Sequence, residues 1–196
     1  LEERLLQAEQ ETKRASDDVL ELQATLGLSS IPRRIACIDI STIQGRDSVG
    51  SVVTFENGAP RKAGYRRFKI KYVEGQDDFA MMAEVTERYF RGLLDHDEDP
   101  PDLLVIDGGK GQLGASRAVL ADLAALDDVD TIGLAKREEE IYLPGRADPI
   151  WLPRRSRALQ LVQHIRNEAH RFAVSYHRTL RTKRTIASQL VTVPGI

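Results

Sequence analysis

The spacing of hydrophobic positions changes along the chain, and the changes predict where helices and strands lie. Residues 1 to about 27 repeat apolar side chains at helical spacing, and this pattern ends at Gly27. After Pro32, short apolar runs separated by turn residues are typical of β-strands. The pattern predicts five strands, which cover residues 34–40, 49–56, 64–70, 102–106 and 131–135. The Asn57-Gly58 pair between the second and third runs favours a hairpin turn.

Helical spacing returns between and after these strands. We expect helices over residues 77–93 and 111–126, and a long C-terminal helix from Ser156 to about Arg184. Residues 139–151 surround a Leu143-Pro144-Gly145 turn and predict a small hairpin. Strands joined by tight turns are antiparallel neighbours, whereas strands separated by helices are parallel.

This order of elements predicts an α/β fold of the RNase H-like type. Its features would be a mixed five-stranded sheet flanked by helices, an extra small hairpin and a long C-terminal helix. We divide the chain into a lead-in helix and linker (1–31), the main domain (32–186) and a C-terminal linker that starts a further module (187–196). A fold of this kind suggests a function but does not establish one.

Composition and charge narrow the class of protein. The chain has 196 residues, of which 41% are hydrophobic and 30% charged, as in a globular protein. The formal net charge is only -2, yet residues 154–184 hold nine basic side chains and the single acid Glu168. This basic stretch has two explanations, a surface that meets phosphates and a helix solvated by its arginines.

The cysteine content and the length of the apolar stretches indicate where in the cell the protein works. Cys37 is the only cysteine and lies in an apolar run, which favours a small buried side chain. No apolar stretch reaches the length of a membrane span, and the N-terminus lacks a signal-peptide pattern. We therefore expect a cytoplasmic protein without a membrane partner.

Two aspartates occupy positions typical of a metal site. Asp39 lies in an apolar strand, and Asp107 ends another. Ligand sites in open α/β sheets lie at the carboxyl ends of strands, and a carboxylate among apolar neighbours is costly without a cation or donors. If the two strands are adjacent and parallel, their carboxylates share one crevice that suits Mg²⁺ or Mn²⁺. Taken singly, each aspartate also fits a role in a cap or turn.

Other candidate groups keep two explanations each. The Gly108-Gly109-Lys110-Gly111 turn lacks the spacing of a nucleotide-binding loop, so it either holds a DNA phosphate through its amides and Lys110 or is a tight turn. Of Asp77 and Asp78, one caps the next helix, most simply Asp77, and the other either faces the crevice or serves the helix dipole.

Three histidines on the final helix have side chains that bind metals or move protons near neutral pH. They are His164, His170 and His177. Spacing alone does not choose among them.

Seven segments between about Pro32 and Arg184 together resemble the C-terminal half of the UvrC family. They are Cys37-Ile-Asp-Ile-Ser-Thr-Ile-Gln-Gly, Val52-Val-Thr-Phe-Glu-Asn-Gly, Tyr65-Arg-Arg-Phe, Gly75-Gln-Asp-Asp-Phe-Ala, Leu104-Val-Ile-Asp-Gly-Gly-Lys-Gly-Gln-Leu, Gly133-Leu-Ala-Lys-Arg-Glu-Glu-Glu and His164-Ile-Arg-Asn-Glu-Ala-His-Arg-Phe-Ala. The resemblance implies an RNase H-related, metal-dependent endonuclease domain. In nucleotide excision repair this domain makes the incision 5′ to a DNA lesion.

The resemblance also implies roles for single residues. Asp39, Asp107 and His170 match the catalytic residues of the family and would bind Mg²⁺ or Mn²⁺, and Asp78 matches a further aspartate of the same incision. The substrate would be damaged double-stranded DNA, and UvrB would bind a segment upstream of this chain. The closing Val-Pro-Gly-Ile resembles the start of a helix-hairpin-helix module. We expect DNA contacts from six basic residues: Lys110, Arg66, Arg67, Arg166, Arg178 and Arg181.

The sequence departs from the family pattern at three positions. Asn167 stands where an aspartate is expected, Thr42 replaces asparagine or histidine, and Arg157 replaces proline. None removes a predicted metal ligand, but Asn167 changes the expected partner of His170. Two rival hypotheses are a catalytically silent RNase H-like DNA-binding module and a nucleotide-binding α/β domain.

Overall fold

The computed structural model describes residues 16–43, 47–125, 127–135 and 139–191, with the backbone alone for Ile43, Asp47 and residues 176–191. Its seven strands form one sheet: β1 Arg34–Ile43, β2 Asp47–Glu56, β3 Ala59–Pro60, β4 Arg66–Lys69, β5 Leu103–Ile106, β6 Asp130–Leu134 and β7 Ile141–Tyr142. The helices are α2 Asp17–Leu26, the short 3-10 helix η1 Lys62–Gly64, α3 Asp78–Asp95, α4 Lys110–Asp122 and α5 Arg157–Val191.

The strand order places β1 and β5 at the centre of the sheet. The order is β3-β2-β1-β5-β6-β7. β4 also pairs with β2, at residues 49–52, whereas β3 pairs with residues 55 and 56. β1 is antiparallel to β2 and parallel to β5, and β5 is parallel to β6. The parallel pairs follow from the helices α3 and α4, which return the chain to the same end of the sheet.

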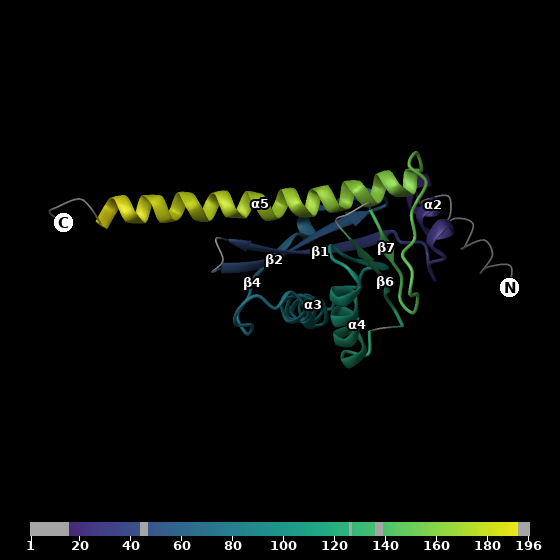
Figure 1. The fold of residues 1–196 in the computed structure, drawn as a ribbon, viewed down its shortest axis with the longest axis horizontal. Helices are drawn as coiled ribbons and strands as arrows, with labels where there is room; N and C mark the ends of the chain where they lie inside the picture. The colour runs from purple at the N-terminus through teal and green to yellow at the C-terminus, as the bar shows by residue number, and fades with distance from the viewer. Residues whose placement is uncertain (1–15, 44–46, 126, 136–138, 192–196) are drawn as a thin grey trace.

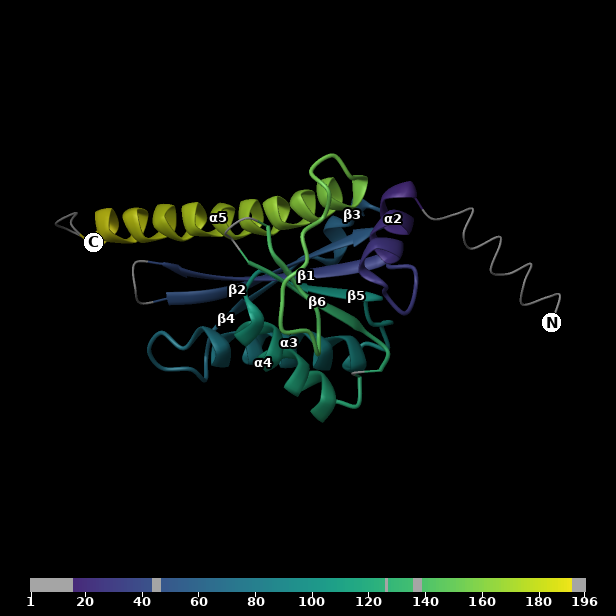
Figure 2. The same ribbon diagram turned by 45° about the vertical axis from the view of Figure 1, so that its right-hand side comes forward.

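Helices cover both faces of the sheet (Figures 1 and 2). α5 and α2 lie on one face, and α3 and α4 lie on the other. The alternation of side chains along β1 fills both layers, because Ile35 and Cys37 pack toward α2 and α5 whereas Ala36 and Ile38 pack toward α3 and α4. Each face therefore has its own hydrophobic core.

The predicted mixed α/β architecture is confirmed, with two short strands added to the expected five. Asn57 and Gly58 form the predicted turn, both with positive φ of 48° and 81°. This turn leads into β3, and the chain reaches β4 only after η1. The third strand therefore begins at Arg66 and not at Gly64, because η1 forms the connection. β7 forms one arm of the predicted hairpin, and Ile141 pairs with Ile150 across it.

The predicted end of the first described helix is confirmed, and the predicted ends of the two later helices α4 and α5 are wrong. α2 ends at Gly27, whose φ of 65° is the left-handed conformation that favours glycine. α4 ends at Asp122, four residues before the predicted end, and α5 continues to Val191 through positions that we had assigned to the linker. The predicted helical segment at residues 1–15 and the chain end at 192–196 lie outside the described residues. Within the described part, no helix is long and apolar enough to cross a membrane.

Candidate active site

Asp39 and Asp107 lie next to each other on two parallel strands. The register pairs Ile38 with Ile106, and the backbone N–H of Asp107 donates a hydrogen bond of 2.9 Å to the carbonyl of Ile38. The two aspartates follow this pair, Asp39 within β1, which continues to Ile43, and Asp107 directly after the end of β5. Their exposed fractions are only 2% and 7%. We call this pair of residues the carboxylate edge.

The electrostatics of Cys37 show which charges gather at the carboxylate edge. Burial of the Cys37 thiol raises its pKa well above the ordinary value, and the charges of Asp107 and Asp39 raise it further. The positive charge of Arg166 on α5 acts in the opposite direction. Two like charges and one guanidinium therefore lie within electrostatic reach of one buried atom. Adjacent buried carboxylates repel each other, an arrangement typical of functional sites.

A cavity of about 440 Å³ separates β5 from α5 above the carboxylate edge, and we call it the α5 cavity. Five residues line it: Asp107, Arg166, Asn167, His170 and Arg171. Of the three candidate histidines, the structure thus brings His170 to Asp107. His164 packs its ring edge-on against Phe55, with centroids 5.2 Å apart. The side chain of His177 lies outside the described residues.

A second cavity, of about 220 Å³, lies on the opposite face of the sheet and also reaches Asp107. Asp78, Gly108, Gly109 and Gln112 are among the residues that line it. Asp77 is the N-cap of α3, because its carboxylate accepts hydrogen bonds from the amides of Phe79 and Ala80. The predicted cap at Asp77 is therefore confirmed, whereas Asp78 lines a cavity with Asp107 and its role in the site stays a prediction.

The glycine-rich turn is explained by close packing, and its phosphate-binding role stays a prediction. A Cβ on Gly111 would lie 2.4 Å from the ring of Phe79, and one on Gly133 would lie 3.0 Å from the carbonyl oxygen of Gly108. These approaches let α3 and β6 pack against the turn. Lys110 is the first residue of α4 and is exposed.

The neighbouring residues Arg66 and Arg67 lie on opposite faces of the sheet. Arg67 pairs with Ser51, which pairs with Asp39, so a row across three strands leads from Arg67 to the carboxylate edge. The Arg67 guanidinium lies 3.8 Å above the ring of Phe172 and donates a hydrogen bond of 2.8 Å to Ser175. Arg66 lies on the α3 side, away from the α5 cavity.

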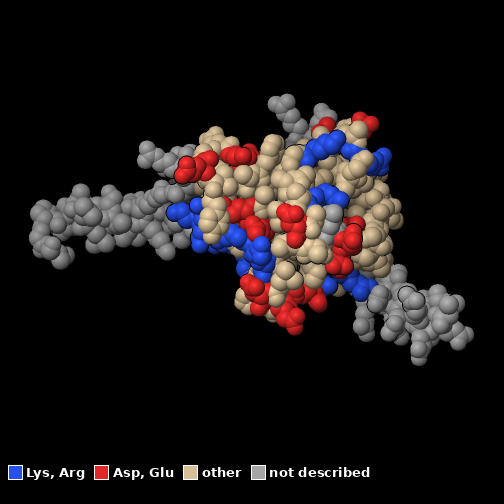
Figure 3. Space-filling model, turned by 90° about the horizontal axis from the view of Figure 1, so that it is seen from below, with Lys and Arg blue, Asp and Glu red and all other residues tan. Residues whose placement is uncertain are grey.

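The Lys, Arg, Asp and Glu side chains are mixed on the α3 and α4 face of the molecule. Figure 3 shows basic and acidic groups side by side there, without one continuous basic field. On the described part of α5, three arginines each pair with a carboxylate: Arg157 with Asp17, Arg166 with Glu139 and Arg171 with Glu168. The side chains of the other two candidate DNA contacts on this helix, Arg178 and Arg181, are not described.

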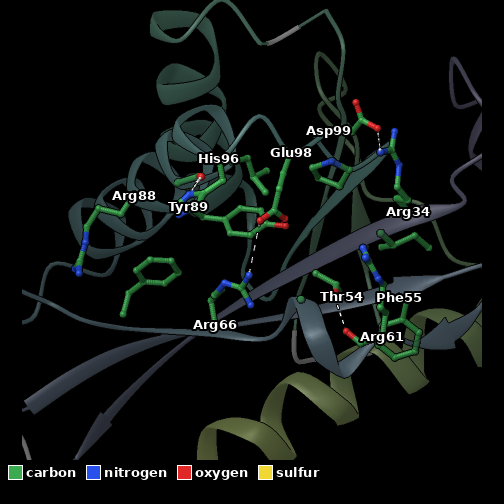
Figure 4. Close-up of a pocket in the computed structure, with 16 residues that line it drawn as sticks. Arg34, Thr54, Phe55, Arg61, Arg66, Arg88, Tyr89, His96, Glu98 and Asp99 are labelled. Carbon is green, nitrogen blue, oxygen red and sulfur yellow. Dashed lines mark hydrogen bonds and ion pairs between the residues drawn. The ribbon is translucent and has the colours of Figure 1, made fainter.

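The opposite end of the sheet holds a third cavity of about 230 Å³, which we call the distal cavity (Figure 4). Arg66 lines it together with Arg34, Arg61, Arg88 and Tyr89. Acidic partners lie beside each of these guanidinium groups: Asp99 for Arg34, Glu56 for Arg61, Glu98 for Arg66 and Glu84 for Arg88. Burial raises the pKa of Tyr89 to about 12 despite the nearby arginines.

Two residues that contact or adjoin the candidate site were not singled out from the sequence, Ser51 and Glu139. The hydroxyl of Ser51 is fully buried beside Asp39 and has no hydrogen-bond partner among the described residues. Glu139 accepts hydrogen bonds from Gln163 and Arg166 of α5. The position of Ser51 twelve residues after Asp39 signals pairing only once the hairpin register is known. Nothing in the local pattern distinguishes Glu139 from the acids beside it.

The donor set at the carboxylate edge fits a hard divalent cation. In the described part of the chain, no three His, Cys, Asp or Glu side chains are gathered so as to hold a metal ion by themselves. Mg²⁺ is usually held by one or two carboxylates together with waters and substrate phosphates. Asp39 and Asp107 supply the two carboxylates, and the α5 cavity leaves room beside them for a phosphodiester.

Comparisons with known proteins identify the family of this chain. Residues 23–174 match the family described as the UvrC RNAse H endonuclease domain. The UvrABC system protein C of Gemmatimonas aurantiaca is 55% identical over the whole chain, and that of Gloeobacter violaceus is 52% identical. The chain spans 32% of the length of each. Among solved structures, endonuclease V from Bacillus subtilis is 14% identical with a TM-score of 0.45, covering 81% of this chain and 91% of its own. The family match covers most of the chain, which therefore belongs to the UvrC RNase H endonuclease domain family.

Proposed function

We propose that this chain is a metal-dependent DNA endonuclease that makes the incision 5′ to a lesion in nucleotide excision repair. The observation that carries the proposal is the carboxylate edge, where two buried aspartates lie side by side on adjacent parallel strands and Asp107 lines a cavity with His170. The names of the relatives support the repair system, and the partner UvrB and the cytoplasmic setting are part of the same proposal.

Asp39 and Asp107 would hold Mg²⁺ or Mn²⁺, and His170 would complete the ligand set or accept a proton from the attacking water. A bound divalent ion polarises a phosphoryl oxygen and lowers the pKa of its water. Burial of both carboxylates excludes bulk solvent, which strengthens their attraction for a cation. Asp78 would act from the second cavity. Asp107 lines both this cavity and the α5 cavity.

The protein would hold DNA through its phosphates and would not recognise the base sequence. Arg166 lies in the α5 cavity, and Lys110 begins the helix that follows Asp107. Arg67, which packs against α5, would contribute charge along the row that leads to Asp39. Arg178 and Arg181 complete the proposed contacts. Arg66 is not included, because its side chain lines the distal cavity.

Nicking of supercoiled plasmid DNA tests the proposal. We expect strand breaks with Mn²⁺ or Mg²⁺ and none with a chelator, and cleavage on the 5′ side of a bulky lesion when UvrB and the rest of the UvrC chain are restored. DNA binding without metal-dependent cleavage under either condition would identify the silent binding module instead. The chelated sample, which is identical in protein and DNA, controls for a contaminating metal-independent nuclease.

A further inference from the structure

Glu139 connects the loop after β6 to two residues of α5. The side-chain amide of Gln163 donates hydrogen bonds of 2.6 and 2.7 Å to the two carboxylate oxygens of Glu139. The Arg166 guanidinium contacts the same carboxylate at 3.3 Å. Gln163 and Arg166 are three residues apart and thus share one face of the helix. One carboxylate therefore holds two neighbouring side chains of α5.

The backbone of Glu139 supports a specific role for this contact. Its φ is 56°, in the left-handed region, which is costly for residues with a Cβ other than asparagine and aspartate. The side chains of Glu139 and Arg166 are only 29% and 21% exposed. The chain thus adopts an unfavourable conformation at the residue that delivers a half-buried carboxylate to Arg166.

Arg166 needs such a partner because of what lies beside it. Its guanidinium and Asp107 line the same cavity, and its charge acts on the Cys37 thiol together with those of Asp107 and Asp39. A guanidinium close to two carboxylates pairs with them readily, and in that position it would repel a divalent cation. Glu139 supplies a competing carboxylate on the outer side of Arg166.

We propose that Glu139 is a positioning residue that keeps Arg166 away from Asp39 and Asp107, so that Arg166 does not compete with the cation for these carboxylates and instead faces a phosphate oxygen. This inference rests on the proposed function and deepens it. Without the charge of Glu139, Arg166 turns toward the aspartates and competes with the metal. Arg166 thereby changes from a contact for DNA into an inhibitor of metal binding.

Mn²⁺ titration of the chain, read by calorimetry without DNA, tests this role. We expect Glu139→Gln to weaken Mn²⁺ binding about tenfold, within the range for residues that orient a metal site. The double variant Glu139→Gln with Arg166→Gln restores the affinity, because the competing guanidinium is gone. Arg166→Gln alone keeps Mn²⁺ binding but raises the KM for DNA nicking. Glu140→Gln is the matched control, since Glu140 accepts its hydrogen bond from Tyr142.

The outcomes separate this inference from the proposed function. Unchanged Mn²⁺ affinity in Glu139→Gln overturns the positioning role, and so does a loss that the double variant fails to restore. If Glu139→Gln does not fold, Arg166→Gln still decides, because weaker Mn²⁺ binding in that variant contradicts competition. Asp39→Asn tests the parent proposal in the same titration, and unchanged Mn²⁺ binding there would refute the metal site itself.

Discussion

The carboxylate edge and the distal cavity place charged groups at opposite ends of the same sheet, but they combine them differently. In the distal cavity, each of four arginines lies beside an acid, and Tyr89 is buried among them. At the carboxylate edge, two acids lie side by side on adjacent strands. Opposite charges placed together stabilise a fold modestly, whereas like charges placed together cost stability.

We interpret this difference as one between a structural cluster and a candidate binding site. The distal cavity has more charged residues than the carboxylate edge, but its positive and negative charges neutralise one another. The carboxylate edge places two acids on adjacent strands, an arrangement that suits a divalent cation. A binding site is therefore recognised by the balance of its charges and not by their number.

The largest expected effect follows from changing the carboxylate edge itself. We expect Asp39→Asn or Asp107→Asn to lower nicking at least about a thousandfold, because each removes a charged metal ligand. The fold should stay intact, because asparagine has nearly the size and shape of aspartate. Nicking rates and thermal melting of both variants measure these effects.

The control for this prediction comes from the distal cavity. Glu98→Gln removes one acid of the exposed Arg66–Glu98 pair, at 4.0 Å, and should leave nicking unchanged with a loss of stability below about 1 kcal/mol. Equal activity of the aspartate variants and the native chain would remove the basis for the comparison.

A smaller effect is expected from the histidines of α5. His170→Ala should lower nicking about a hundredfold, the usual contribution of a group that assists proton transfer. His164→Ala should keep nicking but lower the stability by about 1 kcal/mol, because its ring packs edge-on against Phe55. Kinetics and melting of the two variants decide between them. The reverse result, with His164→Ala inactive, contradicts the choice of His170.

Two buried serines distinguish the row at the carboxylate edge from the core on the other face. Ser116 lies 3.0 Å from the hydroxyl of Thr86, which itself donates to the carbonyl of Met82, so Ser116 is the donor of the pair. Ser116→Ala should therefore lower the free energy of unfolding by about 1 kcal/mol. Ser51→Ala should raise it by a similar amount, because it removes a buried hydroxyl without a partner in the described residues. Urea unfolding measures both, and a loss of stability in Ser51→Ala disproves the distinction.

The last expected effect concerns how the stability depends on pH, at a carboxylate that is paired in the manner of the distal cavity. Hydrogen bonds from Arg171 and Tyr65 hold the pKa of Glu168 at about 2, although burial acts against them. Because this pKa lies below the value of about 4.3 in the unfolded chain, the stabilisation is complete above pH 4.3 and is lost as the pH falls toward 2.

Glu168→Gln removes this dependence. Its melting temperature should fall less steeply than that of the native chain between about pH 4.3 and pH 2, as measured by circular dichroism. Glu87→Gln changes an exposed helical acid that pairs with Arg91 and is a suitable comparison. Parallel acid profiles for Glu168→Gln and the native chain would show that the pairing contributes nothing.

Local pattern determined much of this protein. The change from helical spacing to short apolar runs located the main strands and helices, and Asn57-Gly58 located the hairpin, because hydrophobic pattern and turn chemistry act within a few residues. The helix between the strands of Asp39 and Asp107 also predicted that these strands are parallel. Because β1 and β5 are adjacent and Ile38 pairs with Ile106, the two aspartates that follow lie side by side.

Tertiary structure decided what depends on contacts between distant residues. The pleat of β4 sends Arg67 to α5 and Arg66 to the distal cavity, and only the register with β2 shows which is which. The path of α5 over the sheet brings His170 to Asp107 and His164 to Phe55. Glu139 reaches Gln163 and Arg166 across 24 and 27 residues of chain. Such contacts result from how whole elements pack, and short-range periodicity carries no information about them.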